Sequence, residues 1–210
     1  EVNWSVLLQN VDAAQAQAVA MDLLPHIGFV DQLPVIKTYE FAGLVNKAVI
    51  TWKTPEVPAN DGVRVVFQSD VEFNKLTVLH NTTLADSRIQ QTGFRQLSGS
   101  FRGNNSKGSW RILGQASELL LPELFQVPVL TLSNIEGQGT WANAITPGVP
   151  TDIQIENLRV SNADLEAEVN GSYQFVADQS DVMNLQGKLL RADVAKVPQY
   201  IPLVVGTDAR

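Results

Sequence analysis

Apolar and polar residues alternate without interruption along residues 163–175, the most regular stretch of the chain. The apolar positions are Ala163, Leu165, Ala167, Val169, Gly171, Tyr173 and Phe175. Every residue between them is polar or acidic. Side chains of a β-strand point alternately to its two faces, so the pattern predicts one strand with an apolar face and a polar face. At about 3.3 Å per residue this strand would be roughly 43 Å long, well beyond the usual strand length.

Comparable patterns, interrupted by turn residues, predict β-strands over most of the chain. The expected strands cover residues 2–8, 44–52, 63–67, 71–73, 76–79, 87–89, 94–101, 109–116, 129–132, 137–143, 152–160, 163–175 and 185–190. The sequence GNNSKG at residues 103–108 predicts a hairpin turn, and Pro122 predicts a bend within residues 119–125. Residues 54–62, with two prolines and an Asp-Gly pair, predict a loop and a possible boundary between sub-units.

Helices are expected at only two places. Asp12 and Gln15 have the spacing of a capping box, and the helix-forming residues 13–24 follow until Pro25. A second short helical segment is possible over residues 33–42. A helix of about twelve residues is about 18 Å long, whereas a sheet of about ten strands at ~4.8 Å spacing is tens of ångströms wide. One helix therefore cannot cover the apolar face of the sheet.

Three arrangements would resolve this mismatch. The sheet can fold onto itself as a sandwich, close as a barrel, or stay partly open with its apolar face occupied by something else. A long strand with small and large apolar residues on one face also suits a groove for flexible hydrocarbon chains, because burial stabilises by ~0.8 kcal/mol per CH₂ without requiring polar partners.

Composition and charge exclude several functional classes. The net charge of −7 and the pI of about 4.8 argue against binding to nucleic acid and against a polybasic membrane-binding surface. The chain has no cysteine, so disulfides and thiolate metal sites are excluded. No apolar run reaches the ~18 residues that a membrane-spanning helix needs.

Catalytic and metal-binding motifs are not found in the sequence. The two histidines, His26 and His80, are far apart, and neither has metal-ligand spacing. Asp164, Glu166 and Glu168 share one face of the predicted strand, where a solvated surface is the simpler interpretation. We therefore expect no enzyme activity, no catalytic residue, no cofactor and no metal site.

A short internal similarity links the two ends of the chain. Leu8, Asp12 and Ala14 recur at a constant offset as Leu189, Asp193 and Ala195. Each copy has the pattern of a strand, an Asp-capped helix and then an apolar residue before proline. The similarity predicts that a new repeat unit begins near residue 189, as in a longer array.

Short motifs spread along nearly the whole chain carry a resemblance to a known family. The motifs are Val11-Asp12 with Leu24-Pro25, residues 43–52, Leu97-Ser98-Gly99, Asn105 with Gly108, residues 121–125 (LPELF), Thr140-Trp141, Val160 with residues 162–164 (NAD), Gly171 with Tyr173, Leu185 with Gly187 and Leu189, and Ala192-Asp193 with residues 200–203 (YIPL). In this order and spacing the chain resembles the AsmA-like, YhdP-type proteins of Gram-negative bacteria. Residues 25–42 match the family pattern poorly, and Thr92-Gly93 stand where the family often has Pro-Gly.

The resemblance implies a bridge-like lipid-transfer protein of the periplasm, anchored to the inner membrane by a segment upstream of residue 1. Residues 1–210 would be a single slice of a repeating β-groove that conducts phospholipid between the inner and outer membranes, with the acyl chains inside. One face of each strand would line the groove. The candidate lining residues are Leu97, Phe101, Leu165, Val169, Tyr173 and Phe175.

The expected fold is therefore mainly β: a large, strongly twisted, mostly antiparallel sheet that forms a groove or taco-like open barrel, with one or two short helices. The alternative is a β-sandwich that serves as a structural or interaction module of the cell envelope and conducts no lipid.

Overall fold

The computed structural model describes residues 2–23, 36–54, 66–84, 86–104, 106–142, 151–175, 182–201 and 203. The strands are β1 (Val2–Asp12), β2 (Tyr39–Thr54), β3 (Val66–Thr83), β4 (Ile89–Asn104), β5 (Lys107–Leu120), β6 (Val129–Ala142), β7 (Thr151–Ser161), β8 (Leu165–Phe175) and β9 (Val182–Ala192). The helices are α1 (Ala13–Leu23) and a 3₁₀ helix, η3 (Val197–Tyr200).

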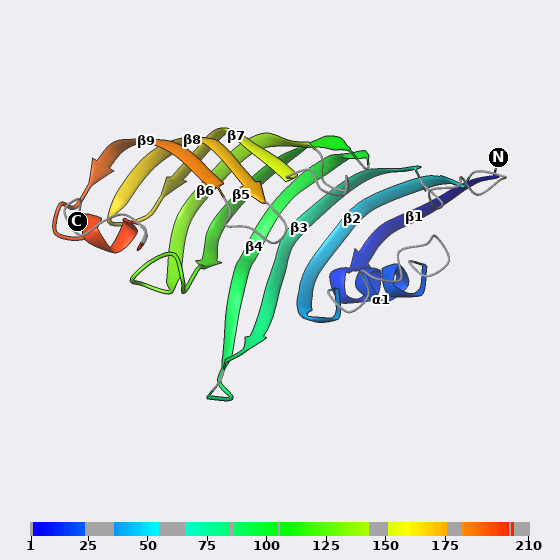
Figure 1. Ribbon diagram of the computed structural model, residues 1–210, viewed down its shortest axis with the longest axis horizontal. Helices are drawn as coiled ribbons and strands as arrows, with labels where there is room; N and C mark the ends of the chain where they lie inside the picture. Colours follow the sequence, from blue (N-terminus) through cyan, green and yellow to red (C-terminus); the bar gives the residue numbers. More distant parts are fainter. Residues whose placement is uncertain are drawn as a thin grey trace.

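The nine strands form one antiparallel sheet in which each strand pairs with the next along the chain, from β1 to β9. The strands follow one another along the long axis of the molecule, and the sheet arches over α1 (Figure 1). The sheet is not closed, so β1 and β9 are its edges. The mainly β fold with an open, curved antiparallel sheet is therefore confirmed, and the sandwich and closed barrel are excluded for the described strands.

Several expected strands are joined in the structure into longer ones. The expected strands 71–73 and 76–79 are parts of β3, which is 18 residues long. Of the expected strand 63–67, Val66 and Phe67 belong to β3, and the rest lies outside the described residues. The expected helix over residues 33–42 is wrong from Tyr39 onward, because β2 begins there and pairs with the end of β3. The expected boundary near residues 54–62 lies almost wholly outside the described residues.

Irregular backbone positions join these pieces. Each strand from β1 to β5 contains at least one residue with a positive φ, among them Asn10, Gly43, Lys75, Gln96 and Ala116. At Gly43 a Cβ atom would clash with the carbonyl oxygen of Lys75, so only glycine fits this close approach. Bulges of this kind bend a strand and shift its alternation by one residue. Long strands can thus curve while keeping apolar residues on the same face.

Side-chain hydrogen bonds support the irregular positions of β3, β4 and β5. The Lys75 N–H donates to Ser98 Oγ (3.0 Å), and Ser117 Oγ donates to the carbonyl oxygen of Gln96 (3.0 Å). Ser117 is fully buried, so this hydrogen bond also satisfies a hydroxyl that water cannot reach. The bends at these positions are therefore held by specific hydrogen bonds.

Two turns follow the local sequence closely. Asn104 Oδ1 accepts hydrogen bonds from the N–H groups of Ser106 (2.9 Å) and Lys107 (3.0 Å), which confirms the hairpin expected at residues 103–108. Asn162 Oδ1 accepts from the N–H groups of Asp164 and Leu165, both at 2.9 Å. This Asx-type turn begins β8 at Leu165, so Ala163 and Asp164 lie outside the strand that the alternation predicted.

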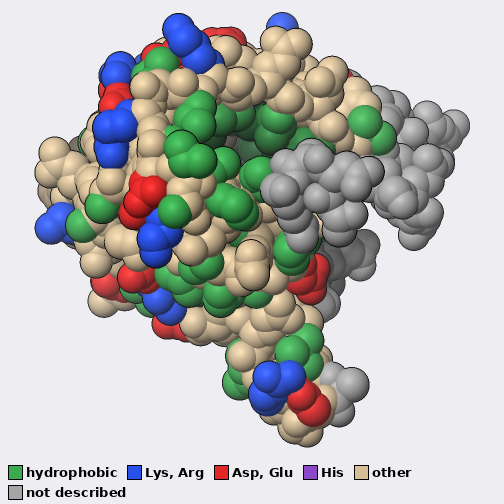
Figure 2. All heavy atoms as spheres, turned by 90° about the vertical axis from the view of Figure 1, so that its left-hand side faces the viewer, with side chains coloured by type: hydrophobic (Ala, Val, Ile, Leu, Met, Phe, Trp, Pro, Cys, Tyr) green, Lys and Arg blue, Asp and Glu red, His purple; other side chains and the backbone are tan. Residues whose placement is uncertain are grey.

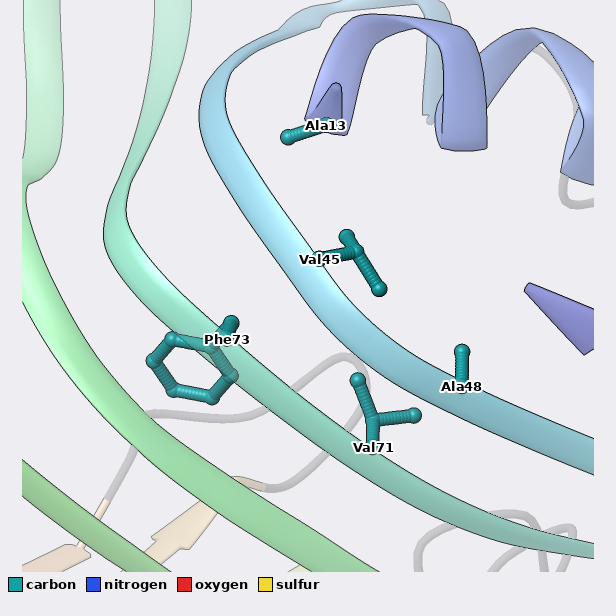
Figure 3. Close-up of a cluster of buried hydrophobic side chains, with 5 residues drawn as sticks. All are labelled: Ala13, Val45, Ala48, Val71 and Phe73. Carbon is teal, nitrogen blue, oxygen red and sulfur yellow. The ribbon is translucent and has the colours of Figure 1, made fainter. Parts of the chain in front are cut away.

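Helix α1 begins where the sequence predicts. Asp12 Oδ1 accepts a hydrogen bond from the N–H of Ala14 (2.8 Å), which caps the first turn. The helix packs against β1–β3, where Ala13 joins a buried cluster with Val45, Ala48, Val71 and Phe73 (Figure 3). Near its other end, Leu23 packs on a second cluster around Trp52. α1 thus covers one end of the sheet.

Candidate functional site

Residues directly opposite each other on neighbouring strands share a face, and three rows of such partners cross the entire sheet. The first row is Leu8, Ala48, Val71, Phe101, Trp110, Gly139, Ile155, Gly171 and Leu185. The second row is Val11, Val45, Phe73, Gly99, Ile112, Gly137, Leu158, Val169 and Gly187. The third row is Val6, Ile50, Ser69, Gly103, Gly108, Trp141, Ile153, Tyr173 and Met183.

These rows define the apolar face of the sheet. Every position in them is glycine or has an aliphatic or aromatic side chain, except Ser69. No charged residue interrupts the rows in any of the nine strands. Because the rows run from strand to strand, they follow the long axis of the molecule (Figure 1). The alternation that the sequence shows strand by strand therefore adds up to one continuous apolar path.

The apolar face is the concave face. The cluster that α1 covers belongs to it, and α1 lies beneath the arch of the sheet (Figure 1). Viewed from the β9 end, hydrophobic side chains line a hollow, while lysine, arginine, aspartate and glutamate lie around the outer surface (Figure 2). The curvature thus turns the apolar face into a groove, which the sequence alone could not assign to either face.

Opposite charges pair across strands on the other face of the sheet, the polar face. Asp70 accepts from Arg102 Nε (2.7 Å) and from Lys47 Nζ (3.2 Å). Further cross-strand pairs are Arg111 with Glu136 and Arg159 with Glu166. The solvated-surface interpretation of Glu166 is consistent with its pairing there. Charge is therefore segregated from the groove.

Five of the six predicted lining residues lie on the apolar face. Leu97 is buried against Leu132 and Ile135, and Leu165 is buried on β8. Phe101 keeps 37% of its surface exposed, whereas Val169 and Tyr173 are half-buried. Phe175 pairs with Thr151 in the strand ladder, but its side chain lies outside the described residues.

Two tryptophans on this face were not predicted as site residues. The Trp141 ring lies over Gly103 and Gly108, and the Trp110 ring lies over Gly139. A Cβ atom at any of these glycines would clash with the ring above it, so each ring needs a glycine beneath it. Phe101 meets Trp141 edge to face, with ring centroids 6.4 Å apart. The signal in the sequence was the set of glycines on strands, which often marks close approach by another group.

Coverage of the groove changes along its length. At β1–β3 the apolar face lies under α1, and its residues form buried clusters. At β9 the apolar side chains remain open, with Leu185 42% and Leu189 52% exposed. The exposed apolar strip at β9 is thus continuous with the buried core at β1–β3. Such a strip is suited to binding a hydrophobic ligand.

Shifted pKa values occur on the polar face of the sheet and in η3. The hydrogen bond from Arg102, reinforced by Lys47, lowers the pKa of Asp70 on the polar face. Partial burial and a hydrogen bond to Asp164 raise the pKa of Tyr200 in η3. The described residues contain no cluster of three or more potential metal ligands. His80 lies against Tyr39, with ring centroids 4.8 Å apart, and His26 is outside the described residues.

Among the described helices, none is long and apolar enough to cross a membrane. The groove thus offers apolar contact and a concave shape, without clustered acid, base or nucleophile among the residues described. Such a surface binds by excluding water from hydrocarbon, and its selectivity comes from shape.

Comparison with known proteins identifies the family. The family model described as YhdP protein matches residues 3–210, nearly the whole chain. No curated protein and no solved structure matches the chain. The chain belongs to the YhdP family, a lipid-transport family of the Gram-negative cell envelope.

Proposed function

We propose that this chain is a segment of a phospholipid conduit in the periplasm, with acyl chains held in the groove and headgroups left outside it. The observation that supports this most directly is the continuity of the three apolar rows across all nine strands. A groove that ended in a pocket would hold one ligand, whereas an unbroken path along the long axis suits movement. Binding here is non-enzymatic.

The energetics fit acyl chains better than a rigid ligand. Burial contributes ~0.8 kcal/mol per CH₂, so a chain of about twelve buried methylenes would gain about 10 kcal/mol before entropic costs. Along the part of the path that α1 does not cover, this gain is similar from point to point, so a chain that slides there meets no deep minimum. A floor of glycine, aliphatic and aromatic residues without charge provides such a path.

Equivalent aspartate-capped turns after β1 and β9 support a repeating groove. Asp12 caps the N–H of Ala14 after β1, and Asp193 caps the N–H of Ala195 (3.1 Å) after β9. We infer that the segment from residue 189 begins a further repeat unit of the groove. Residues 1–210 would then be one slice of a protein that is anchored in the inner membrane and reaches toward the outer membrane.

Photo-crosslinking in the full-length protein, in its Gram-negative host, tests the conduit. A small aliphatic diazirine amino acid is placed at Phe101, Val169 or Tyr173 on the apolar face. Matched controls place it at the neighbouring residues Ser100 and Glu168 on the polar face. We expect phospholipid adducts by mass spectrometry at the three apolar positions and none at the controls.

A charge in the groove provides the complementary test. Val169→Asp is expected to reduce the lipid adduct at Tyr173 at least several-fold while the protein stays folded by circular dichroism, because Val169 is only half-buried. A folded protein without lipid adducts at any apolar position would refute the conduit, as would equal labelling of both faces.

A further inference from the structure

Helix α1 lies directly on the apolar path. Ala13 and Ala16 pack on the cluster formed by Val45, Ala48, Val71 and Phe73, and Leu23 packs near Trp52 and Ile50. The helix therefore follows the strands β1–β3 on the concave face for about 16 Å. It lies beneath the sheet at the end opposite β9 (Figure 1).

The apolar rows continue unchanged beneath the helix. Leu8, Ala48 and Val71 in the first row are followed by Phe101 and Trp110, which α1 does not cover. The covered floor is thus chemically equivalent to the open floor. If α1 were displaced, the same surface could accept acyl chains.

The attachment of α1 is slight for a helix on a sheet. Ala13 is its one buried side chain among the described residues, and Ala16 and Leu23 pack on the two clusters while only half-buried. Among the described residues, Gln17 makes the polar contact of α1 with the chain around the start of β2: its Nε2 donates to the carbonyl oxygens of Ile36 and Tyr39, both at 3.1 Å. The described side chains of α1 make no ion pair with the sheet. Small side chains bury little area, so displacement costs less than for a leucine-rich helix.

We propose that α1 is a removable strap that regulates passage of acyl chains between the open groove over β4–β9 and the covered floor over β1–β3. This inference rests on the proposed conduit. In the structure the strap is closed. Breaking the Gln17 hydrogen bonds releases it, and acyl chains then replace α1 on the apolar rows.

The test uses two positions for the diazirine amino acid in the full-length protein in its host. Tyr173 reports the open groove, and Ile50, which is half-buried near Leu23, reports the covered floor. Gln17→Ala removes both hydrogen bonds to the carbonyl oxygens. Gln15→Ala is the matched control, because Gln15 is exposed on the same helix.

A reversible tether provides the opposite perturbation. Residues 1–210 contain no cysteine, so Gln17→Cys with Tyr39→Cys introduces the one cysteine pair of this segment, where the native side chain contacts the Tyr39 carbonyl. A short, reductively cleavable bis-maleimide joins the pair. Cleaving the reagent restores the unlocked state in the same molecules, which controls for folding.

We expect Gln17→Ala to increase lipid labelling at Ile50 several-fold, the tether to abolish it and cleavage to restore it. Labelling at Tyr173 should stay constant throughout. Equal labelling at Ile50 in the native, Gln17→Ala and tethered proteins would overturn the strap, as would absence of labelling at Ile50 in the Gln17→Ala and cleaved proteins. Absence of lipid at Tyr173 in every form would instead refute the conduit itself.

Discussion

The two ends of the apolar face have the same residue pattern but different surroundings. Under α1, Val71 and Phe73 on β3 are buried, whereas Met183 and Leu185 on β9 are about 40% exposed. All four belong to the three rows of cross-strand partners. Alternation therefore determines which face a side chain takes, and the covering element determines whether that side chain stabilises the fold or remains available to a ligand.

Truncation of one aromatic residue under α1 should have the largest effect on stability. Phe73→Ala removes a buried ring from the cluster with Val45 and Ala13 and should lower the free energy of unfolding by about 3–4 kcal/mol. Met183→Ala is the matched change at the open end, and its cost should stay below about 1 kcal/mol. Chemical denaturation followed by circular dichroism measures both.

Equal costs for these two variants would contradict the comparison. A large cost at Met183 would mean that the open end is as tightly packed as the covered end. A small cost at Phe73 would mean that the cluster beneath α1 adds little stability, and the distinction between core and groove along the sheet would be lost.

Two glycines on the apolar face should respond differently to an added methyl group. A Cβ at Gly139 would clash with the Gln154 carbonyl oxygen and with the Trp110 ring, so Gly139→Ala should destabilise by about 2 kcal/mol. At Gly187 the nearest heavy atom to a new Cβ is the Glu168 carbonyl oxygen at 3.9 Å, an ordinary contact. Gly187→Ala should therefore change stability by less than about 1 kcal/mol.

Tryptophan fluorescence and thermal unfolding distinguish these outcomes. The Gly139 variant should shift the emission maximum, because Trp110 must move from its place over the strand, while the Gly187 variant should not. If both variants show the same emission shift and the same change in thermal stability, the centre of the groove is no more tightly packed than its β9 end.

Local patterns were sufficient to predict most of the strands, α1 and the apolar face of β8. They failed at Ser87 and Arg88, which lie in the turn before β4, and at residues 39–42, which belong to β2. They were insufficient where strands bend: in β3 the irregularity at Lys75 shifts the alternation, and the sequence therefore looked like several short strands. The long strand at 163–175 was overextended by two residues, because the side chain of Asn162 forms the turn before Leu165. Bulges and Asx turns depend on the hydrogen-bond partners of neighbouring segments, which alternation does not encode.

The concave face could not be predicted from alternation, since both faces of an isolated strand are equivalent in this respect. Curvature arises from bends that line up between strands, such as those supported by Ser98 and Ser117. The predicted lining residues on β4 and β8 share the apolar face, yet Leu97 and Leu165 are buried within it. Burial depends on neighbours distant in sequence, so open and closed positions required the structure.

The smallest effect is expected on the polar face of β3, where Asp70 and Glu72 alternate with Val71 and Phe73. Arg102→Gln removes the main partner of Asp70, so the pKa of Asp70 should rise toward its ordinary value of 3.8. Because the folded-state pKa is lowered, the stabilisation by this pair is present above pH 3.8 and is lost as pH falls through the folded pKa. Carboxyl ¹³C chemical shifts measured by NMR across that range report the change directly.

At neutral pH the same variant should unfold at nearly the native denaturant concentration, because Arg102 is largely exposed and exposed ion pairs contribute little. Arg102→Lys is the control that keeps the charge, and with it the Asp70 pKa should stay closer to its native value. If Arg102→Gln destabilised the protein as much as Phe73→Ala, the ion pairs on the polar face would contribute as much to the stability of β3 as its buried apolar cluster does. The contrast between covered and open apolar surface would then no longer explain why one end of the sheet is packed and the other is available.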